Sequence, residues 1–448
     1  MATGFRVRPA HLVVLALALP PAWKLVEWGA SRSARASKAL DPKAVASGET
    51  LFNHTWTVKD PMAGGDGLGP VFNARSCVEC HNQGGVGGGG PSDLNVTIFG
   101  VLALAAGDKS ETRAGVVHRD ATSPGQIELL SHVGPGVQGG RPSVEALKSL
   151  NASCSIPGGV SFSQRNTPAL FGDGLLDLIP EDELHAAQRQ NSLAARLVGL
   201  SRAKDPMIRG RVARLPDGRL GRFGWKAEFA TLNEFVKAAC ANEIGLSNPG
   251  RPQPVSLAHR GTSPASSSTR RDDLTAAQCD EMTEFIRALR TPVRVAPDDP
   301  ARRSQAEAGE AIFARIGCAD CHAPDLGSIA GFYSDLLLHD LGGSLSAGAG
   351  SYGEATTPKG STTKPVPNEW KTPPLWGVAD SAPYLHDGRA LDLDEAILAH
   401  GGESQGVTDR FRALPDGDKS AVIAFLRTLR APGSPAGKSG SLARADLD

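Results

Sequence analysis

The sequence predicts a mainly α-helical protein built from two similar domains in tandem. Three observations lead to this prediction. A set of short motifs occurs twice along the 448 residues, in the same order each time. Each set begins and ends with apolar residues at helical spacing, and few segments show the alternation typical of strands. The 52 glycines and 32 prolines indicate long loops but stay below the share typical of disordered chains.

The repeated set consists of three pairs of matching segments. The first pair reads Gly-Glu and ends in Phe, with the spacing of a short amphipathic helix. The second pair reads Thr-Pro, then Leu, an aromatic residue and Gly. The third pair has apolar residues at helical spacing and a terminal proline, which predicts a helix that stops there. The pairs are 48–52 with 309–313, 167–172 with 372–377, and 285–292 with 425–432.

These pairs predict one domain at residues 40–292 and another at 300–432. The first domain is longer because of loop insertions around 84–160 and 246–270. The second insertion is rich in Pro, Ser and Arg, which is typical of a surface loop. The stretch Gly84–Gly90 is mostly glycine, and since no Lys-Ser or Lys-Thr follows it, we expect a flexible loop without a phosphate site.

The two ends of the chain are predicted to lie outside these domains. Residues 1–36 contain the apolar run Leu12–Leu19, preceded by arginines and ended by Pro20, as in a secretion signal. Ala34-Arg35-Ala36 fits a cleavage site, and an uncleaved N-terminal anchor is the alternative. Both interpretations predict a periplasmic or secreted protein. Residues 433–448 are predicted to form a disordered tail.

Four of the seven cysteines lie in two copies of a C-x-x-C-H motif. Two thiols at this spacing can bind the vinyl groups of one haem, and the following histidine can bind its iron. Chance alone gives about 0.003 copies at this composition. A zinc site needs no histidine after both pairs and usually has the two Cys pairs much closer together in the chain. A thioredoxin-like pair needs a βαβ context, which this sequence lacks. We therefore predict two cytochrome-c-like domains, each with a covalently bound c-type haem. The motif residues are Cys77, Cys80 and His81, and Cys318, Cys321 and His322.

The low aromatic content of the chain agrees with two haems, and its net charge argues against nucleic acid as a partner. Only 5% of the residues are aromatic, and haem rings would fill the space that aromatic side chains usually fill in a core. The net charge of −1 excludes the broad positive surface that nucleic-acid binding needs. Cys154, Cys240 and Cys279 allow at most one disulfide, and we expect buried structural cysteines.

Further segments share their pattern with a known family: Thr167–Leu176, Gly221–Ala227, Thr372–Gly377, Tyr384–Arg389 and Glu395–Glu403. Together with the haem motifs, they resemble the di-haem oxidoreductase and peroxidase family. That family is related to the bacterial di-haem cytochrome c peroxidases and to the di-haem methylamine-utilisation enzyme. The resemblance covers about residues 45–430. It implies two facing cytochrome c domains and a peroxidase-like activity.

The resemblance also implies a sixth ligand for the C-terminal haem. His400 stands five residues beyond Glu395, where the peroxidases have Met and the methylamine enzyme has Tyr. A haem bound by His322 and His400 is expected to be low-spin and suited to electron transfer. An ordinary histidine at a helix end is the alternative. For His386, in the nearby His-Asp-Gly-Arg stretch, the resemblance implies a structural role.

The matching segment of the first domain lacks such a ligand. Ala239, which cannot bind iron, stands five residues beyond Glu234. The N-terminal haem is therefore expected to be the open, reactive one. Another group could still bind this iron, and His118 is the leading candidate. The other candidates are His54, His132 and Met62.

Two residues of this region resemble catalytic groups of the peroxidases. Trp225 matches the tryptophan that lies between the two haems, which implies a role in electron transfer. Glu243 matches the distal glutamate, and such a carboxylate can move a proton between peroxide oxygens. Phe235 stands where the peroxidases have Gln, which predicts a more apolar pocket. The alternatives are a plain core tryptophan and a solvated charge at a helix end.

Together these residues favour a di-haem oxidoreductase that takes electrons at the C-terminal haem and reduces hydrogen peroxide at the N-terminal haem. A small cytochrome or cupredoxin is the expected electron donor. One alternative is an electron carrier without catalysis. Another is an oxidase acting on an organic substrate, for which the apolar Phe235 favours O2. The peroxidase relatives hold Ca2+ between their domains, but no dense carboxylate loop in this sequence demands one.

Overall fold

The computed structural model describes residues 39–103, 111–122, 160–199, 208–254, 271–347, 352 and 368–433. Leu40–Asp448 forms one compact unit. Several predicted features lie outside the described residues: the signal or anchor at 1–36, the tail beyond 433, Cys154, His132 and most of the insertion at 246–270.

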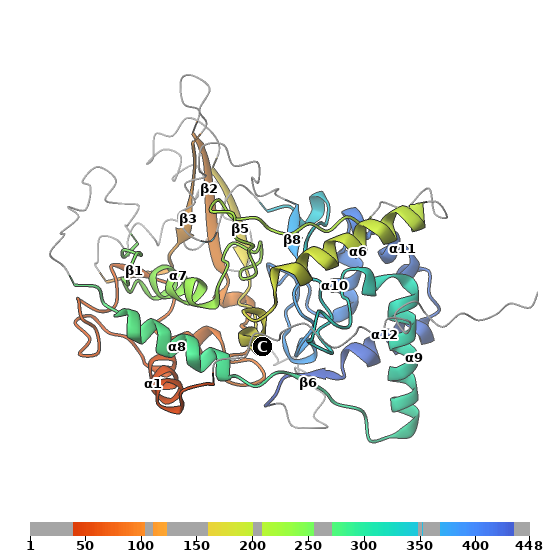
Figure 1. Ribbon diagram of the computed structural model, residues 1–448, viewed down its shortest axis with the longest axis horizontal. Helices are drawn as coiled ribbons and strands as arrows, with labels where there is room; N and C mark the ends of the chain where they lie inside the picture. Colours follow the sequence, from red (N-terminus) through yellow and green to blue (C-terminus); the bar gives the residue numbers. More distant parts are fainter. Residues whose placement is uncertain are drawn as a thin grey trace, which may run out of the picture. The chain divides into compact units, whose positions relative to one another are not determined.

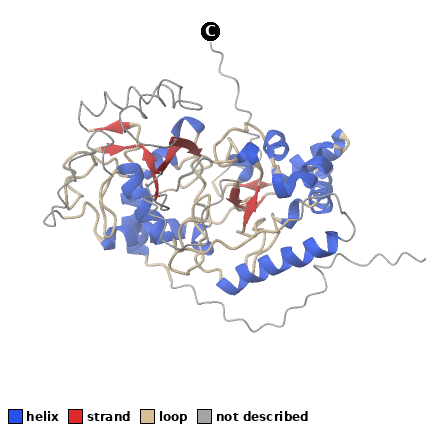
Figure 2. Ribbon diagram, turned by 90° about the horizontal axis from the view of Figure 1, so that it is seen from above, coloured by secondary structure: helices blue, strands red, loops and turns tan. Residues whose placement is uncertain are grey.

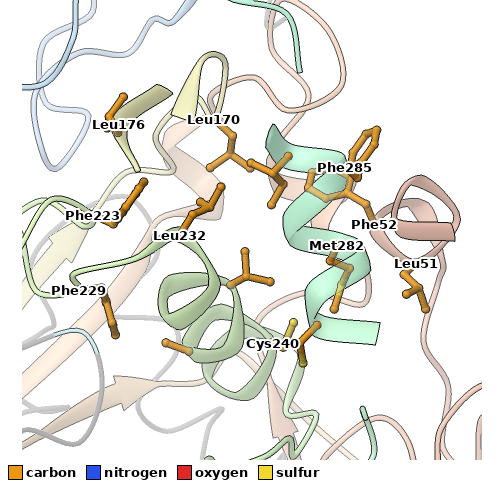
Figure 3. Close-up of a cluster of buried hydrophobic side chains, with 14 of the residues drawn as sticks. Leu51, Phe52, Leu170, Leu176, Phe223, Phe229, Leu232, Cys240, Met282 and Phe285 are labelled. Atoms are coloured by element: carbon orange, nitrogen blue, oxygen red, sulfur yellow. The ribbon is translucent and has the colours of Figure 1, made fainter. Parts of the chain in front are cut away.

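Three helices form the N-terminal core: α1 (Pro42–Asn53), α7 (Leu232–Ile244) and α8 (Ala276–Ala288). Helices α1 and α8 pack against each other (Figure 1). Gly48 allows the close approach, because a Cβ at this position would overlap the backbone of α8 at Glu281. Figure 3 shows Phe52 of α1 beside Phe285 of α8, and their ring centroids lie 5.2 Å apart.

Two helices form the C-terminal core in the same way: α9 (Pro300–Ile316) and α12 (Asp416–Leu426). A Cβ at Gly309 of α9 would overlap the backbone of α12 at Ala421, just as a Cβ at Gly48 would overlap the backbone of α8. The rings of Phe313 and Phe425 are 5.4 Å apart. The predicted repeat therefore extends from the sequence to the packing of the helices.

Buried apolar side chains form two main clusters, one around α1, α7 and α8 and the other around α9 and α12. The first cluster also contains Phe332, Leu336, Leu337 and Trp376 from the C-terminal half. These residues make one core from both halves of the chain. The division into domains at 40–292 and 300–432 stays a prediction.

Part of the first insertion is a sheet, which corrects the expectation of a loop. β2 (Val96–Ala103) pairs antiparallel with β3 (Glu111–Val117) and β5 (Val160–Arg165), in the order β3-β2-β5. Ile98, in the middle of this sheet, is fully buried. The run Val-Thr-Ile-Phe at 96–99 favours a strand through its β-branched and aromatic side chains. The described residues otherwise contain mainly helices and short strands (Figure 2).

The helices at the ends of the two repeats are shorter than predicted. Helix α8 ends at Ala288 and α12 at Leu426, several residues before the prolines. The residues that follow form a pair of short strands, β6 (Val293–Arg294) with β9 (Leu429–Arg430). Backbone pairing between the ends of the two repeats takes the place of a last helical turn.

The remaining elements are short except for α6. The helices are α2 (Cys77–Cys80), α5 (Asp173–Leu176), α6 (Glu181–Gly199), α10 (Leu393–Ala399) and α11 (Gln405–Arg412), and the strands are β1 (Val71–Phe72), β4 (Asp120–Ala121), β7 (Leu338–Asp340) and β8 (Glu369–Lys371). β1 pairs with β4, and β7 pairs with β8. Within the described ranges, none of the helices is long and apolar enough to cross a membrane.

Candidate haem sites

A large cavity lies beside the first C-x-x-C-H motif. The space between the residues that line it is about 1020 Å³, part of it open to solvent, and most of the lining side chains are apolar. Cys77, Cys80 and His81 lie on its wall together with Trp225 and Glu243. The structure therefore brings five of the predicted site residues together around one space, which we call the N-terminal cavity.

The first haem motif is held by a short helix. Ser76 caps α2 by accepting a hydrogen bond from the Glu79 N–H at 3.2 Å. Cys77 and Cys80 are three residues apart on this turn, so both thiols lie on the same side. The His81 N–H then donates to the Cys77 carbonyl at 3.0 Å, which continues the turn through the histidine.

The ring of His81 is oriented for metal binding. Its Nδ1 donates a hydrogen bond to the Gly88 carbonyl at 3.2 Å, which leaves the lone pair of Nε2 available. Burial lowers the pKa of His81 to about 4, so the ring is neutral at neutral pH. A neutral imidazole with one nitrogen anchored is the form that binds iron.

The glycine stretch 84–90 supports this histidine, which corrects the expectation of a flexible loop. Gln83 pairs with Gly89 across a tight turn, and the Leu170 N–H donates to Gly87 at 2.8 Å. Gly88 has no room for a side chain, because a Cβ would overlap the Gln83 carbonyl. The glycines therefore build a compact turn whose carbonyl fixes the His81 ring.

Helix α7 presents one face to the N-terminal cavity, which we call the distal wall: Phe235, Ala239, Cys240 and Glu243. These residues recur at three- and four-residue spacing and so lie along one side of the helix. Thr231 caps the start of α7, accepting from the Glu234 N–H at 3.2 Å. Ala239 lines the cavity as expected and offers no iron ligand.

Glu243 is the acid of the distal wall. Its Oε2 accepts a hydrogen bond from Asn73 Nδ2 at 2.7 Å, whereas its buried Oε1 has no hydrogen-bond partner among the described residues. Burial raises the pKa of Glu243 to about 7, although the nearby Tyr352 hydroxyl and Asn73 amide favour the charged form. A carboxyl with this pKa can both accept and release a proton at neutral pH.

Tyr352 is a cavity residue that the sequence reasoning missed. It lines the N-terminal cavity although it belongs to the C-terminal half of the chain. Its ring packs against Phe235, with centroids 6.0 Å apart. No motif surrounds it. The chain has only three tyrosines, and this rarity is the one feature of the sequence that could have pointed to Tyr352.

Arg165 is a second missed residue, and it tests whether the cavity fits a haem. It lines the cavity, is 4% exposed, and its Nε and Nη2 have no hydrogen-bond partner among the described residues. Burial lowers the pKa of Arg165 to about 10, opposed by the charges of Glu228 and Asp387. A buried guanidinium with two unpaired nitrogens calls for an anionic partner. A carboxylate of a bound haem would satisfy that need.

Trp225 links the cavity with the C-terminal half. Its Nε1 donates to the Asn166 carbonyl at 2.8 Å, and its own carbonyl accepts from the Lys371 N–H at 3.0 Å. Lys371 belongs to β8, which pairs with β7. On β7, His339 lies 3.6 Å from the sulfur of Cys321 in the second haem motif. Trp225 therefore stands between the two predicted haem sites along the chain of contacts.

The second haem motif has the same histidine geometry as the first. His322 Nδ1 donates to the Tyr333 carbonyl at 3.0 Å, and the ring lies 6.3 Å from Phe313, as His81 lies 6.3 Å from Phe52. Burial, and the nearby His400, lower the pKa of His322 to about 4.

His400 is oriented like a ligand. It caps the end of α10, and its Nδ1 donates to the Ala396 carbonyl at 2.6 Å, which leaves Nε2 available. Burial lowers its pKa, so this ring is also neutral at neutral pH. The predicted pair of His322 and His400 is consistent with this geometry.

Three other candidate ligands, His118, His54 and Met62, are absent from the described lining of the N-terminal cavity. His118 is absent from the described lining, and its Nε2 donates to the Asn242 carbonyl at 2.9 Å. His54 binds Asp60 at 3.0 Å, and Met62 is 36% exposed. The structure therefore gives no support to a ligand role for His118, which stays a prediction.

Other predicted residues have structural surroundings. His386 is buried and stacks on Trp370 at 3.6 Å, in line with its expected structural role. Cys240 and Cys279 are buried free cysteines, as expected. In the part of the chain that the structure describes, no group of three or more His, Cys, Asp or Glu side chains forms an ion site, so Ca2+ gains no support.

The chain is similar to two proteins over part of its length. It is 32% identical over 142 residues to the methylamine utilization protein MauG of Methylorubrum extorquens, a match covering 30% of this chain and 37% of MauG. It is 28% identical over 159 residues to the cytochrome-c peroxidase IdrP1 of Denitromonas iodatirespirans, covering 30% of this chain and 42% of IdrP1. The chain thus spans less than half the length of either relative.

A solved structure and a family model match larger parts of the chain. The diheme peroxidase BthA of Burkholderia thailandensis is 15% identical, with a TM-score of 0.42 over 90% of both chains. The model described as "Di-haem oxidoreductase, putative peroxidase" matches residues 143–429, more than half of the sequence. The matched range contains Trp225, Glu243 and His400 together with the second haem motif. The chain therefore belongs to the di-haem oxidoreductase family.

Proposed function

We propose that this chain is an extracytoplasmic di-haem peroxidase that receives electrons at its C-terminal haem and reduces hydrogen peroxide at its N-terminal haem. One observation carries the proposal. Glu243, with a pKa raised to about 7 by burial, and the first C-x-x-C-H motif line one cavity. The described lining contains no second histidine to close the site.

Two sets of residues would hold the haems. Cys77 and Cys80 would attach the N-terminal haem, with His81 on its iron and Arg165 on a carboxylate. The second haem would use the attachment and iron-binding residues Cys318, Cys321, His322 and His400. When bound, a haem with an open axial position supplies redox chemistry and a place for a small oxidant, and one with two histidines supplies electron transfer.

Glu243 would manage the protons. In its charged form the carboxylate accepts a proton from one peroxide oxygen and returns it to the other, which leaves as water. The mostly apolar lining of the cavity, which includes Phe235 and Val236, would limit the access of water to the carboxyl. Asn73 holds Oε2 and keeps the carboxyl turned to the cavity.

The reaction needs two electrons and two protons for each hydrogen peroxide, and it forms two waters. We propose a reduced small redox protein, a cytochrome or a cupredoxin, as the donor of the electrons. They would enter at the haem of His322 and His400 and pass near Trp225. The apolar run at 12–19 supports a location outside the cytoplasm, where such donors are found.

Glu243→Gln tests this function. The amide keeps the size of the side chain but cannot accept the proton, so peroxide turnover with a reduced small cytochrome is expected to fall about 100-fold or more. Haem content and the visible spectrum are expected to stay as in the unchanged protein. Glu234→Gln, on the same helix but ion-paired with Arg219 at the surface, is the matched control. Full turnover by the Glu243 variant, or none by the unchanged protein with both haems present, would contradict the proposal.

A further inference from the structure

Tyr352 reaches the N-terminal cavity from the C-terminal half and is fixed there by three sets of contacts. Its N–H donates to Glu228 Oε1 at 2.9 Å, and Glu228 itself lines the cavity. Its ring packs edge-on against Phe229, with centroids 6.3 Å apart, and against Phe235 at 6.0 Å. Its hydroxyl is close enough to Glu243 to favour the charged carboxylate. Backbone, ring and hydroxyl therefore all engage this site.

Glu243 has one carboxyl oxygen held and one not. Asn73 holds Oε2, whereas Oε1 is buried without a hydrogen-bond partner among the described residues. A buried acceptor left without a hydrogen bond destabilises the folded protein. The phenol of Tyr352 is an O–H donor that lines the same cavity as this carboxyl.

We propose that Tyr352 is a positioning residue whose hydroxyl donates to Oε1 of Glu243. Asn73 and Tyr352 then hold the carboxylate from both sides and keep it facing the oxidant. The hydroxyl also supplies the polar group that the distal wall lacks at Phe235. The proposal rests on the proposed function of Glu243. It means that the N-terminal site is complete only when the C-terminal half contributes its tyrosine.

Tyr352→Phe tests the proposal in the full-length protein with both haems. The variant keeps the ring contacts with Phe229 and Phe235 and removes only the hydroxyl. A hydrogen bond to a charged group corresponds to about a 10- to 100-fold effect. We expect kcat for peroxide to fall by about that factor, with KM changed less than about twofold, because the oxidant still binds but the base is misplaced.

A second readout needs no turnover. Hydrogen cyanide must give up its proton when it binds an open haem iron, so a misplaced base slows its binding. We expect the association rate of cyanide with oxidised Tyr352→Phe to fall about 10-fold. Tyr384→Phe is the matched control: this ring packs in the C-terminal cluster and lies outside the described cavity lining. It is expected to behave like the unchanged protein.

Three outcomes separate the possibilities. If Tyr352→Phe matches the unchanged protein in kcat and in cyanide association while Glu243→Gln loses turnover, the role of Tyr352 is overturned and the proposed function stands. If Glu243→Gln also keeps full turnover, the proposed function fails as well. Should the Phe variant lose haem, Tyr352→Trp, which keeps a ring and an N–H donor, carries the test. A Trp variant with both haems is expected to keep kcat within about fivefold, and a Phe-like loss overturns the role.

Discussion

At the scale of single residues, backbone carbonyls decide which histidine nitrogen is available. His81, His322 and His400 each donate Nδ1 to a carbonyl, of Gly88, Tyr333 and Ala396 respectively, and keep Nε2 free. Their pKa values are all lowered, first of all by burial. His118 differs because its Nε2 is the nitrogen that donates to a carbonyl. A hydrogen bond from Nδ1 to a carbonyl thus favours three of these histidines as ligands. A hydrogen bond from Nε2 to a carbonyl disfavours the fourth.

The pKa of Glu243 predicts the pH dependence of the reaction. Burial raises it to about 7, and the base must be charged to accept a proton. The second-order rate with peroxide is therefore expected to rise about tenfold per pH unit below 7 and to level off above. Stopped-flow measurements from pH 5 to 9 check this prediction, and the rate of Glu243→Gln is expected not to rise with pH in this way. If the rate of that variant rises with pH as in the unchanged protein, the pH dependence belongs to another group.

The same shift has a consequence for stability. A carboxyl whose pKa is higher in the folded protein favours folding most at low pH. The contribution of Glu243 is full below its ordinary value of 4.5 and is lost as the pH rises through about 7. The contribution of Glu243 to the stability of the fold is therefore lost over the same pH range in which its carboxyl becomes charged.

At the scale of elements, two helix crossings depend on glycine. Gly48 and Gly309 lie where a Cβ would meet the backbone of the partner helix. We expect Gly48→Ala and Gly309→Ala each to reduce the free energy of unfolding by about 1 to 3 kcal/mol. Thermal unfolding followed at the haem absorbance and by circular dichroism measures this effect. Gly417→Ala, in α12 with open space around it, is the control and should change stability by less than about 0.5 kcal/mol. Equal stability of all three variants would refute the crossing argument.

These crossings also show what the sequence could predict. The repeated Gly and Phe positions are visible as a pattern in the sequence, because α1 packs against α8 in the same way as α9 packs against α12. The same residue types are therefore needed at both contacts. The sheet β3-β2-β5 was not expected, because its strands come from an insertion that the repeat does not contain. The helix ends were placed too late since the pairing of β6 with β9 joins residues more than 130 apart in sequence.

At the cavity, the residues predicted from the sequence are those for which a motif or a family resemblance was available. Cys77, Cys80 and His81 belong to a motif, Ala239 and Glu243 were placed by family resemblance, and all five line the cavity. Tyr352 and Arg165 belong to no motif. They line the cavity through tertiary contacts alone. The unpaired atoms that draw attention to them, two nitrogens of Arg165 and Oε1 of Glu243, are visible only in the folded chain.

At the scale of the whole molecule, a continuous set of contacts joins the two predicted haem sites. Trp225 lines the N-terminal cavity and binds β8 through Lys371. In the pairing of β8 with β7, Trp370 stands opposite His339, which lies 3.6 Å from the Cys321 sulfur. Tyr352 adds a contribution of the C-terminal half to the N-terminal site. Both links favour two haems that work as one unit rather than as separate electron carriers.

The central claim is that one haem has two histidine ligands while the other is open. An electron paramagnetic resonance spectrum of the oxidised protein, recorded before and after adding cyanide, tests it most directly. We predict one low-spin signal that cyanide leaves unchanged and one high-spin signal that cyanide converts to low spin, in equal amounts. Two low-spin signals, both unaffected by cyanide, would mean that both irons are closed and would contradict the account.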